Sequence, residues 1–194
     1  MYPMSSTTRL NDLTRYEAVT DPGGPAMTWG MFAIGYLELG DVERGWSLFQ
    51  KSYQPYYHPP FYMWTENVNG TGAVNFITGM GGFLQAVMFG YFGTRVHLDR
   101  IEFNPILPET VTIMNMDGVD YFGAEFDIVV TADVVELNFT SVQPDLPLVL
   151  YSQDNIVEIA EVQVVQIPRE YFKLRPLQVE YLEKCPISDE TIGN

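Results

Sequence analysis

The stretch that decides the fold is uncharged: residues 26–37, with the sequence AMTWGMFAIGYL. Pro25 is well placed as the first helical residue, and the first charge comes only at Glu38. A helix that is apolar on every side is normally a buried helix. Gly40 is suited to close this helix, and Asp41 is suited to cap the next one. The sequence therefore predicts a chain built around buried helices.

The next expected helix, residues 42–54, is amphipathic. Its apolar side chains recur on one face at steps of four, three and four. They are Val42, Trp46, Phe49 and Tyr53. Arg44 and Lys51 lie off this face, and we interpret both as ordinary solvated charges. A third helix, residues 81–92, is again uncharged. The order of buried, amphipathic and buried helices favours two concentric layers, with inner and outer helices alternating.

On either side of the helices the sequence changes character. Residues 1–24 are expected to form an extended loop, because turn residues recur at 11–12 and 21–24. Beyond Gly93, short runs rich in β-branched and aromatic residues alternate with turn signals, including residues 116–118 and 153–155. Such a pattern is typical of an antiparallel sandwich. The expected strands are residues 95–98, 101–103, 111–114, 126–130, 134–139, 148–151, 156–159 and 162–165.

We therefore expect an α+β protein in three parts. Residues 1–93 form a helical domain, residues 94–175 form a small β-sandwich domain, and residues 176–194 form a loose acidic tail. The boundary is placed near Gly93, where unbroken apolar runs give way to short strands.

Composition excludes several classes of function. The chain has 194 residues and a net charge of −15, and its 10 Lys and Arg residues form no cluster, which argues against a nucleic-acid partner and an anionic membrane surface. Cys185 is the only cysteine, so no internal disulfide forms. His58 and His97 have no second ligand at metal spacing, and we expect neither a metal nor another cofactor. No signal peptide or membrane span is visible, and we expect a cytoplasmic protein.

One loop carries the candidate chemistry. Residues 61–76 read FYMWTENVNGTGAVNF, with many aromatic and amide side chains and a single carboxylate, Glu66. Aromatic rings pack on sugar rings, and amides hydrogen-bond sugar hydroxyls. Three glycines, at 79, 81 and 82, are expected to open the helix that follows, so that free backbone N–H groups point into the same site. The simpler alternative is that Glu66 is only a solvated loop residue.

Four sequence blocks together resemble one family. They are residues 24–29 (GPAMTW), 64–67 (WTEN), 72–76 (GAVNF) and 78–85 (TGMGGFLQ). In order and spacing they resemble the carboxy-terminal part of glycoside hydrolase family 65, in particular its protein-glucosylgalactosylhydroxylysine glucosidase branch, with acid trehalases as more distant relatives. The resemblance covers roughly residues 1–140. It implies an (α/α)6 barrel followed by a small β-sandwich.

The resemblance also implies roles for individual residues. Glu66 matches the general base of an inverting glycosidase, and the substrate is an α-glucoside such as glucosyl-galactosyl-hydroxylysine. The matching blocks contain the residues expected to contact that substrate, namely Trp64, Asn67, Trp29, Thr28 and Asn75. The general acid of the family lies in a part of the barrel that this chain lacks. Since inversion requires both carboxyl groups, we expect the chain alone to be inactive and its missing barrel portion to be its partner.

The basic residues also bear on whether the reaction is hydrolysis or phosphorolysis. Family relatives that are phosphorylases must bind a phosphate dianion, and between Lys51 and Arg95 this chain has no basic residue apart from the possible cation His58. Hydrolysis is therefore favoured.

The alternative to a glycosidase fragment is a non-catalytic carbohydrate-binding or interaction module, which the β-sandwich supports by itself.

Overall fold

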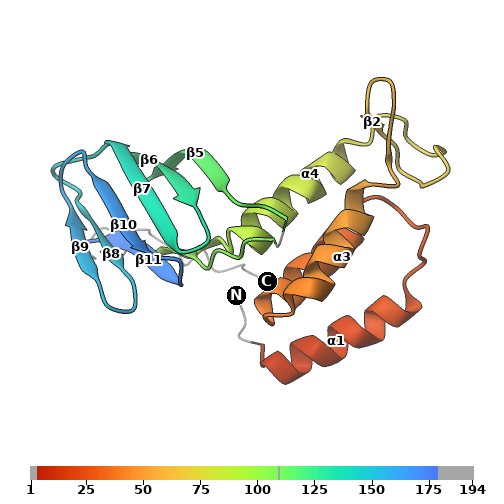
Figure 1. The fold of residues 1–194 in the computed structure, drawn as a ribbon, viewed down its shortest axis with the longest axis horizontal. Coiled ribbons are helices and arrows are strands. Elements are labelled where there is room, and N and C mark those ends of the chain that lie inside the picture. The colour runs from red at the N-terminus through yellow and green to blue at the C-terminus, as the bar shows by residue number, and fades with distance from the viewer. Residues whose placement is uncertain (1–3, 109, 179–194) are drawn as a thin grey trace, which may run out of the picture. The chain divides into compact units, whose positions relative to one another are not determined.

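The computed structural model describes residues 4–108 and 110–178, and the chain divides into two compact units. One comprises Met1–Thr94 with Asn104–Val111, and the other comprises Arg95–Phe103 with Thr112–Asn194. The first unit is helical and the second is built of strands (Figure 1). Fold class is thus mixed helix and antiparallel sheet, whereas the barrel and the sandwich remain predictions.

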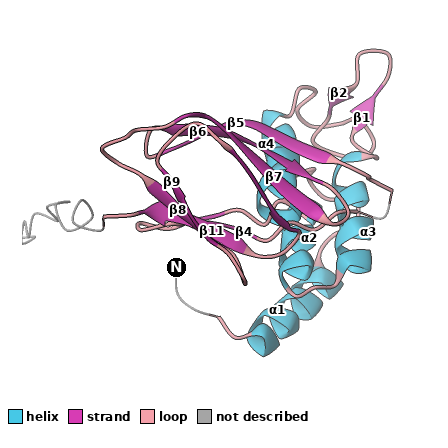
Figure 2. Ribbon diagram, turned by 60° about the vertical axis from the view of Figure 1, so that its left-hand side comes forward, coloured by secondary structure: helices cyan, strands magenta, loops and turns pink. Residues whose placement is uncertain are grey.

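The described residues of the helical unit form four α-helices and one π-helix. Its elements are α1 (Ser6–Val19), α2 (Trp29–Glu38), α3 (Val42–Tyr53), the two-residue strands β1 (Tyr57–His58) and β2 (Met63–Trp64), α4 (Ile77–Gln85) and the π-helix η1 (Ala86–Tyr91) (Figure 2). Asp41 caps α3 as predicted, because its Oδ1 accepts a hydrogen bond of 3.0 Å from the Arg44 N–H. Gly40 ends the preceding helix with a φ of +80°, a conformation that glycine adopts without strain.

The expectation of an extended loop over residues 1–24 is wrong, because α1 occupies most of it. Ser5 caps this helix by accepting a hydrogen bond of 3.1 Å from the Thr8 N–H. The helix then binds α2 and α3 through Glu17, which accepts a hydrogen bond from the Tyr36 hydroxyl and pairs with Arg44. Arg44 is therefore an ion-pair partner of α1 and not an isolated solvated charge.

An aromatic cluster joins the remaining helices. Phe49 of α3 lies 5.2 Å from Phe83 of α4 and 5.1 Å from Tyr91 of η1, measured between ring centroids. Other apolar side chains of α2 and α4 are exposed to solvent. Ile77 and Leu84 of α4 are 71% and 60% exposed, and Met31 of α2 is 43% exposed. The prediction of a buried helix is thus wrong for α4, in which only Gly79 is buried, and holds in part for α2, which buries Trp29 and Leu37 but leaves Met31 exposed.

The helix expected over residues 81–92 begins earlier than predicted, as α4. It starts at Ile77 rather than residue 81, so Gly81 and Gly82 lie inside it. The Gly79 N–H donates a hydrogen bond of 3.1 Å to the Phe76 carbonyl. These glycines therefore do not open the helix with free N–H groups. Close packing explains one of them, since a Cβ on Gly79 would lie only 2.8 Å from Trp64 Nε1.

The second unit holds two antiparallel sheets. The four-stranded sheet has the order β10-β7-β6-β5, and the five-stranded sheet has the order β3-β4-β11-β8-β9. Buried residues alternate along the strands, and the fully buried rings Phe126 and Phe139 lie side by side on neighbouring strands. The strands are β3 (Arg95–Val96), β4 (Ile101–Phe103), β5 (Met114–Tyr121), β6 (Ala124–Val130), β7 (Val134–Ser141), β8 (Leu148–Tyr151), β9 (Ile156–Ile159), β10 (Val164–Pro168) and β11 (Phe172–Pro176).

Three strand expectations need correction. Residues 111–113 precede β5 rather than form a strand, and β11 was not predicted. The turn expected at residues 116–118 is a bulge inside β5, where the register against β6 shifts between Met116 and Val119. Gly118 has a φ of +69° there, and its N–H donates to Asp127 Oδ1 at 2.8 Å. The chain reverses later, at Phe122 and Gly123.

The expected loose tail begins inside a strand. Pro176 pairs with Leu148 as the last residue of β11, so the strand reaches into the expected loose tail. Residues 179–194, including Cys185, lie outside the described residues. None of the helices within residues 4–108 and 110–178 has the length and apolar character needed to span a membrane.

Candidate active site

The Glu66 loop is tied down by backbone hydrogen bonds on both sides. The hairpin of β1 and β2 pairs Tyr57 with Trp64 and leads the chain into it. The Glu66 N–H then donates to the Ala73 carbonyl at 2.9 Å, and the Glu66 carbonyl accepts from the Ala26 N–H at 2.9 Å. The loop is therefore attached both to its own return segment and to the segment that leads into α2.

The carboxylate of Glu66 is held at one oxygen. Oε2 accepts a hydrogen bond of 3.0 Å from the Ala73 N–H, while no described residue donates to Oε1. The side chain is half-buried. Gly72 makes this arrangement possible, since its φ is +80° and a Cβ at this position would lie 2.6 Å from Oε2. One oxygen is thus anchored, and the other is available to a ligand or to water.

Asn67 is engaged within the loop. Its Nδ2 donates to the carbonyl and to the Oγ1 of Thr71, both at 3.3 Å. Thr71 Oγ1 in turn donates to Asn69 Oδ1 at 2.6 Å. Asn67 also lines an open hollow of about 380 Å³, to which Glu66 does not contribute. The other residues lining this hollow are Gly23, Val68, Asn69 and Thr71.

A buried threonine holds the start of the loop. Thr65 is 6% exposed, and its hydroxyl oxygen lies 2.8 Å from the Asn67 carbonyl and 3.2 Å from the Tyr56 carbonyl, the two acceptors available to its one proton. The same hydroxyl lies 3.1 Å from His58 Nε2, across the β1–β2 hairpin. His58 thus fixes the position of the loop. No three His, Cys, Asp or Glu side chains of the described residues come together as a possible metal site.

The two tryptophans of the candidate site are positioned differently. Trp64 is half-buried and packs edge-on against Phe83, with 5.8 Å between ring centroids. Trp29 is only 2% exposed, and the Nζ of Lys51 lies 3.4 Å from its ring centroid. Burial and the charge of Arg44 lower the pKa of Lys51. In this structure Trp29 therefore offers no open ring face, and its contact with substrate remains a prediction.

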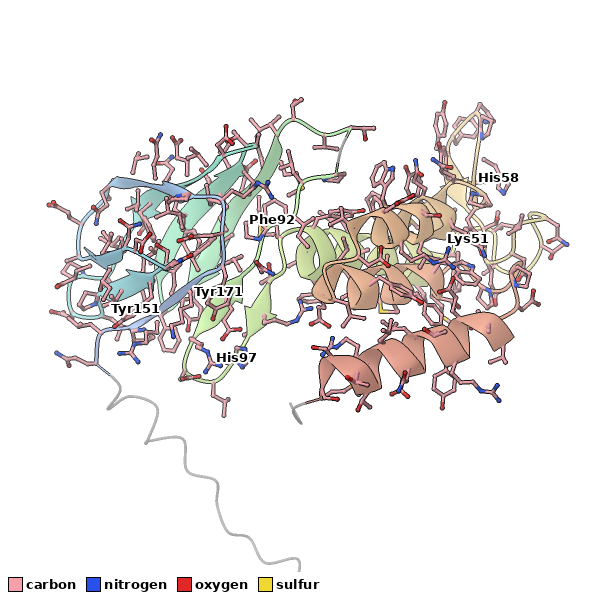
Figure 3. All side chains as sticks on the ribbon, turned by 60° about the horizontal axis from the view of Figure 1, so that its bottom comes forward. Lys51, His58, Phe92, His97, Tyr151 and Tyr171 are labelled. Carbon is pink, nitrogen blue, oxygen red and sulfur yellow. The ribbon has the colours of Figure 1, made fainter. Side chains whose placement is uncertain are left out.

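The interpretation of Lys51 as an ordinary solvated charge is wrong, because its ammonium group lies over the ring of Trp29. Figure 3 shows Lys51 and His58 labelled in the helical unit. Sequence spacing gives no signal for either contact, because Trp29 and Lys51 lie on different helices.

The six predicted site residues lie on two connected segments. Trp64, Glu66 and Asn67 belong to the loop that begins at β2, and Asn75 is an exposed residue near its end. Thr28 is the residue before α2, and its side chain makes no capping hydrogen bond. The Ala26–Glu66 hydrogen bond joins the two segments. The contacts from Gly72 and Ala73 to Glu66 were not predicted from sequence.

The chain is similar to known glycosidases. A protein-glucosylgalactosylhydroxylysine glucosidase from Danio rerio is 51% identical over 137 residues, which are 71% of this chain and 21% of that protein. One of the same name from Gallus gallus is 41% identical over 170 residues, or 87% of this chain and 24% of that protein. Acid trehalases and kojibiose hydrolases match at lower identity. No protein-family model matches.

A solved structure supports the fold alone. A putative kojibiose phosphorylase from the human microbiome has a TM-score of 0.63 at 14% identity, covering 86% of this chain and 22% of that one. The chain thus spans about a fifth to a quarter of these proteins. It is related to a family of glycosidases that includes the protein-glucosylgalactosylhydroxylysine glucosidases, and it corresponds to only part of them.

Proposed function

We propose that this chain is part of an inverting glycoside hydrolase of family 65, in which Glu66 is the general base. The observation that carries the proposal is the geometry of Glu66. One carboxylate oxygen is anchored by the Ala73 N–H, and the other has no described donor. The proposed substrate is a glucose unit in α-linkage, as in the glucosyl-galactosyl-hydroxylysine named for its relatives.

In this mechanism Glu66 Oε1 accepts a proton from a water molecule. The water oxygen attacks the anomeric carbon while the bond to the leaving oxygen breaks on the opposite face of the sugar. A second carboxyl group, roughly 6.5–9.5 Å from the first, must protonate that leaving oxygen. Between Glu43 and Asp99 the chain has no acidic residue other than Glu66. We assign the second group to a part of the enzyme outside this chain, because the chain spans only 21% and 24% of two related glucosidases.

The open helix faces support the assignment to an incomplete barrel. Ile77, Leu84 and Met31 are exposed on helices that carry few or no charges. Further helices of an (α/α)6 barrel would cover them, and the two antiparallel sheets of the second unit would form its β-sandwich. The likeness in fold to a solved protein more than four times as long is compatible with this arrangement.

Hydrolysis is proposed rather than phosphorolysis. The basic side chains close to the loop in sequence already have partners, since Lys51 lies over Trp29 and His58 contacts Thr65. A phosphate dianion would need such a cation to be free. The water-activating role of Glu66 has no such requirement.

The test of Glu66 uses a complete enzyme that contains this chain. Glu66→Gln keeps the shape of the side chain but removes its basicity, so turnover should fall roughly 10²–10⁴-fold with little change in substrate binding. Glu43→Gln, an exposed change on α3, is the matched control and should have no effect. Near-normal turnover of the Glu66 variant, or a product that retains the anomeric configuration, would refute the assignment.

A second experiment tests whether the chain is sufficient by itself. The purified chain should not hydrolyse glucosyl-galactosyl-hydroxylysine, trehalose or a nitrophenyl glucoside above the level of its Glu66→Gln variant, because one carboxylate cannot perform both proton transfers. Turnover that depends on Glu66 would show that the general acid lies within these 194 residues.

A further inference from the structure

The strand-rich unit contains a hollow that is remote in sequence from Glu66. Its volume is about 440 Å³, and it lies where the end of β8 meets the turn between β10 and β11. Two tyrosines that line it, Tyr151 and Tyr171, are labelled in Figure 3. The full set of lining residues is Tyr151, Ser152, Gln153, Glu170, Tyr171 and Lys173.

The first ring, Tyr171, lies beside a charged pair, Glu102 and Arg100. Burial, followed by the charge and hydrogen bond of Glu102, raises the pKa of Tyr171, so its hydroxyl stays protonated. Glu102 is itself fixed by a hydrogen bond of 2.5 Å from Arg100 Nε. Although burial opposes ionisation of Glu102, the hydrogen bonds from Arg100 and Tyr171 lower its pKa overall. The ring lies beside this charged pair, and 44% of the residue is exposed.

The second ring, Tyr151, is fixed by two cations of β11. Arg175 Nη2 donates to the Tyr151 hydroxyl at 3.0 Å, and the Arg175 guanidinium carbon lies 4.9 Å from the ring centroid. Lys173 pairs with Tyr151 across the strands and places its Nζ 5.5 Å from the same ring. Tyr151 is therefore ordered before any ligand arrives, which lowers the entropic cost of binding.

The polar groups around the rings are of both charge signs. Glu170 Oε1 accepts a hydrogen bond of 2.9 Å from the Gln153 N–H, so its second oxygen is available as an acceptor. Lys173 contributes an ammonium donor, and the Gln153 side-chain amide contributes both kinds of group. Aromatic rings suit the C–H face of a sugar, and such mixed donors and acceptors suit its hydroxyls.

From this arrangement we propose that the hollow binds a neutral hexose unit of a glycan, at a site separate from the one that contains Glu66. An anionic ligand is disfavoured because Glu170 lines the hollow and the chain carries a net charge of −15. A purely apolar ligand is disfavoured because it would remove water from the Lys173 ammonium and from the second oxygen of Glu170 without hydrogen-bonding to either. Weak binding, in the millimolar range, is expected for a single sugar in an open site.

The experiment is an amide NMR titration of the whole 194-residue chain with glucose, galactose and an α-glucosyl-galactose disaccharide. Saturable shifts are expected at Gln153 and Tyr171. Tyr171→Ala should weaken binding by about tenfold, the effect of one lost aromatic contact, whereas Tyr171→Phe should retain most of it because the ring remains. Gln153→Ala, a change in an exposed turn, should also weaken binding. Tyr16→Ala on α1, a tyrosine that is 62% exposed, is the matched control and should bind as the unaltered chain does.

Several results would overturn the proposal. One is an absence of saturable shifts up to about 100 mM sugar. Another is that the folded Tyr171→Ala and Gln153→Ala variants bind sugar as tightly as the unaltered chain. A third is that inorganic phosphate causes stronger shifts than sugar. The Glu66→Gln chain separates this site from the catalytic one, and its shifts at Gln153 and Tyr171 should be unchanged. Shifts confined to residues 64–76 would support the catalytic proposal and refute this one.

Discussion

At the scale of single residues, Gly72 determines where the Glu66 carboxylate lies. A Cβ at residue 72 would meet Glu66 Oε2 at 2.6 Å and Asn67 Nδ2 at 2.8 Å, in a backbone conformation with φ of +80°. Gly72→Ala should therefore displace the carboxylate and weaken its hydrogen bond with the Ala73 N–H. The measurements are the free energy of unfolding and the hydrogen-exchange rate of the Ala73 amide.

Gly70 is the matched control for this change. It has a nearly equal φ of +77°, but a Cβ there would have open space around it. Gly70→Ala should cost about 1 kcal/mol of stability from backbone strain alone and leave the Ala73 amide unchanged. Equal effects of the two substitutions on stability and on Ala73 would show that contact with the carboxylate does not matter.

A second residue-scale prediction concerns Tyr121, which is 8% exposed and whose hydroxyl has no described hydrogen-bond partner. Burial, together with the charge of Asp99, raises its pKa to about 12 against the opposing effect of Arg100. An unfolded tyrosine ionises near pH 10. Its contribution to stability is therefore fully present below pH 10 and is lost as the pH rises through 12.

Replacing the Tyr121 hydroxyl tests both the cost of burying it unpaired and the effect of its ionisation at high pH. Tyr121→Phe should stabilise the chain by about 1 kcal/mol at neutral pH, because a buried unpaired hydroxyl is removed. The loss of stability between pH 10 and 12 should also become less steep, as measured by denaturant unfolding at each pH. Tyr16→Phe, at an exposed position, should change neither quantity. An unchanged slope for Tyr121→Phe would mean that another group causes the alkaline loss.

Sequence reasoning located the candidate loop but not its internal contacts. Glu66 stands out as the single carboxylate of a long segment, and this is visible without a structure. Its hydrogen bond with Ala73 and the Lys51–Trp29 contact depend on how the chain folds back. No local pattern records such contacts, so these partners could not be predicted.

At the scale of elements, prediction succeeded for an amphipathic helix and for two short apolar strands next to turn residues. The expected helix 42–54 differs from α3 (Val42–Tyr53) by one residue, and β8 and β9 were predicted with the bounds that they have. The helix α1 was missed because its few apolar residues form no continuous face and none is buried. The bulge in β5 was read as a turn, since a glycine signals a positive φ but not whether the chain reverses.

The attachment of α1 offers an element-scale prediction. Its Glu17 binds both Tyr36 and Arg44, so Glu17→Ala should remove these two contacts, leave the Arg9–Glu38 ion pair in place, and cost roughly 1.5–3 kcal/mol of local stability. Trypsin should then cleave faster after Arg9 and Arg15, while hydrogen exchange in α3 stays slow. Asp12→Ala, an exposed change on the same helix, should leave cleavage unaltered. Equal cleavage rates for the two variants would show that other contacts, namely apolar packing and the Arg9–Glu38 ion pair, hold α1.

At the scale of the whole molecule, the apolar composition of the helices contrasts with their exposure to solvent. The chain has 46% hydrophobic residues, yet several large apolar side chains of its uncharged helices are exposed. Helices of this kind are normally buried inside a larger protein. The chain also spans only 21% and 24% of two related glucosidases. Both facts are accounted for if these helices are covered by further barrel helices in the complete enzyme.

This account predicts that the isolated chain associates through those faces. Large contiguous apolar patches promote self-association and binding of hydrophobic dyes. Sedimentation should show concentration-dependent association, and the double variant Ile77→Ser with Leu84→Lys should reduce both association and dye binding. Stability should change little, because the two residues are 71% and 60% exposed. Val96→Ser with Leu98→Lys, at positions 70% and 91% exposed in the strand-rich unit, is the matched control and should leave association unchanged. A monomer that binds no dye would mean that the open helix faces need no partner, and the proposal of an incomplete barrel would then lose its structural support.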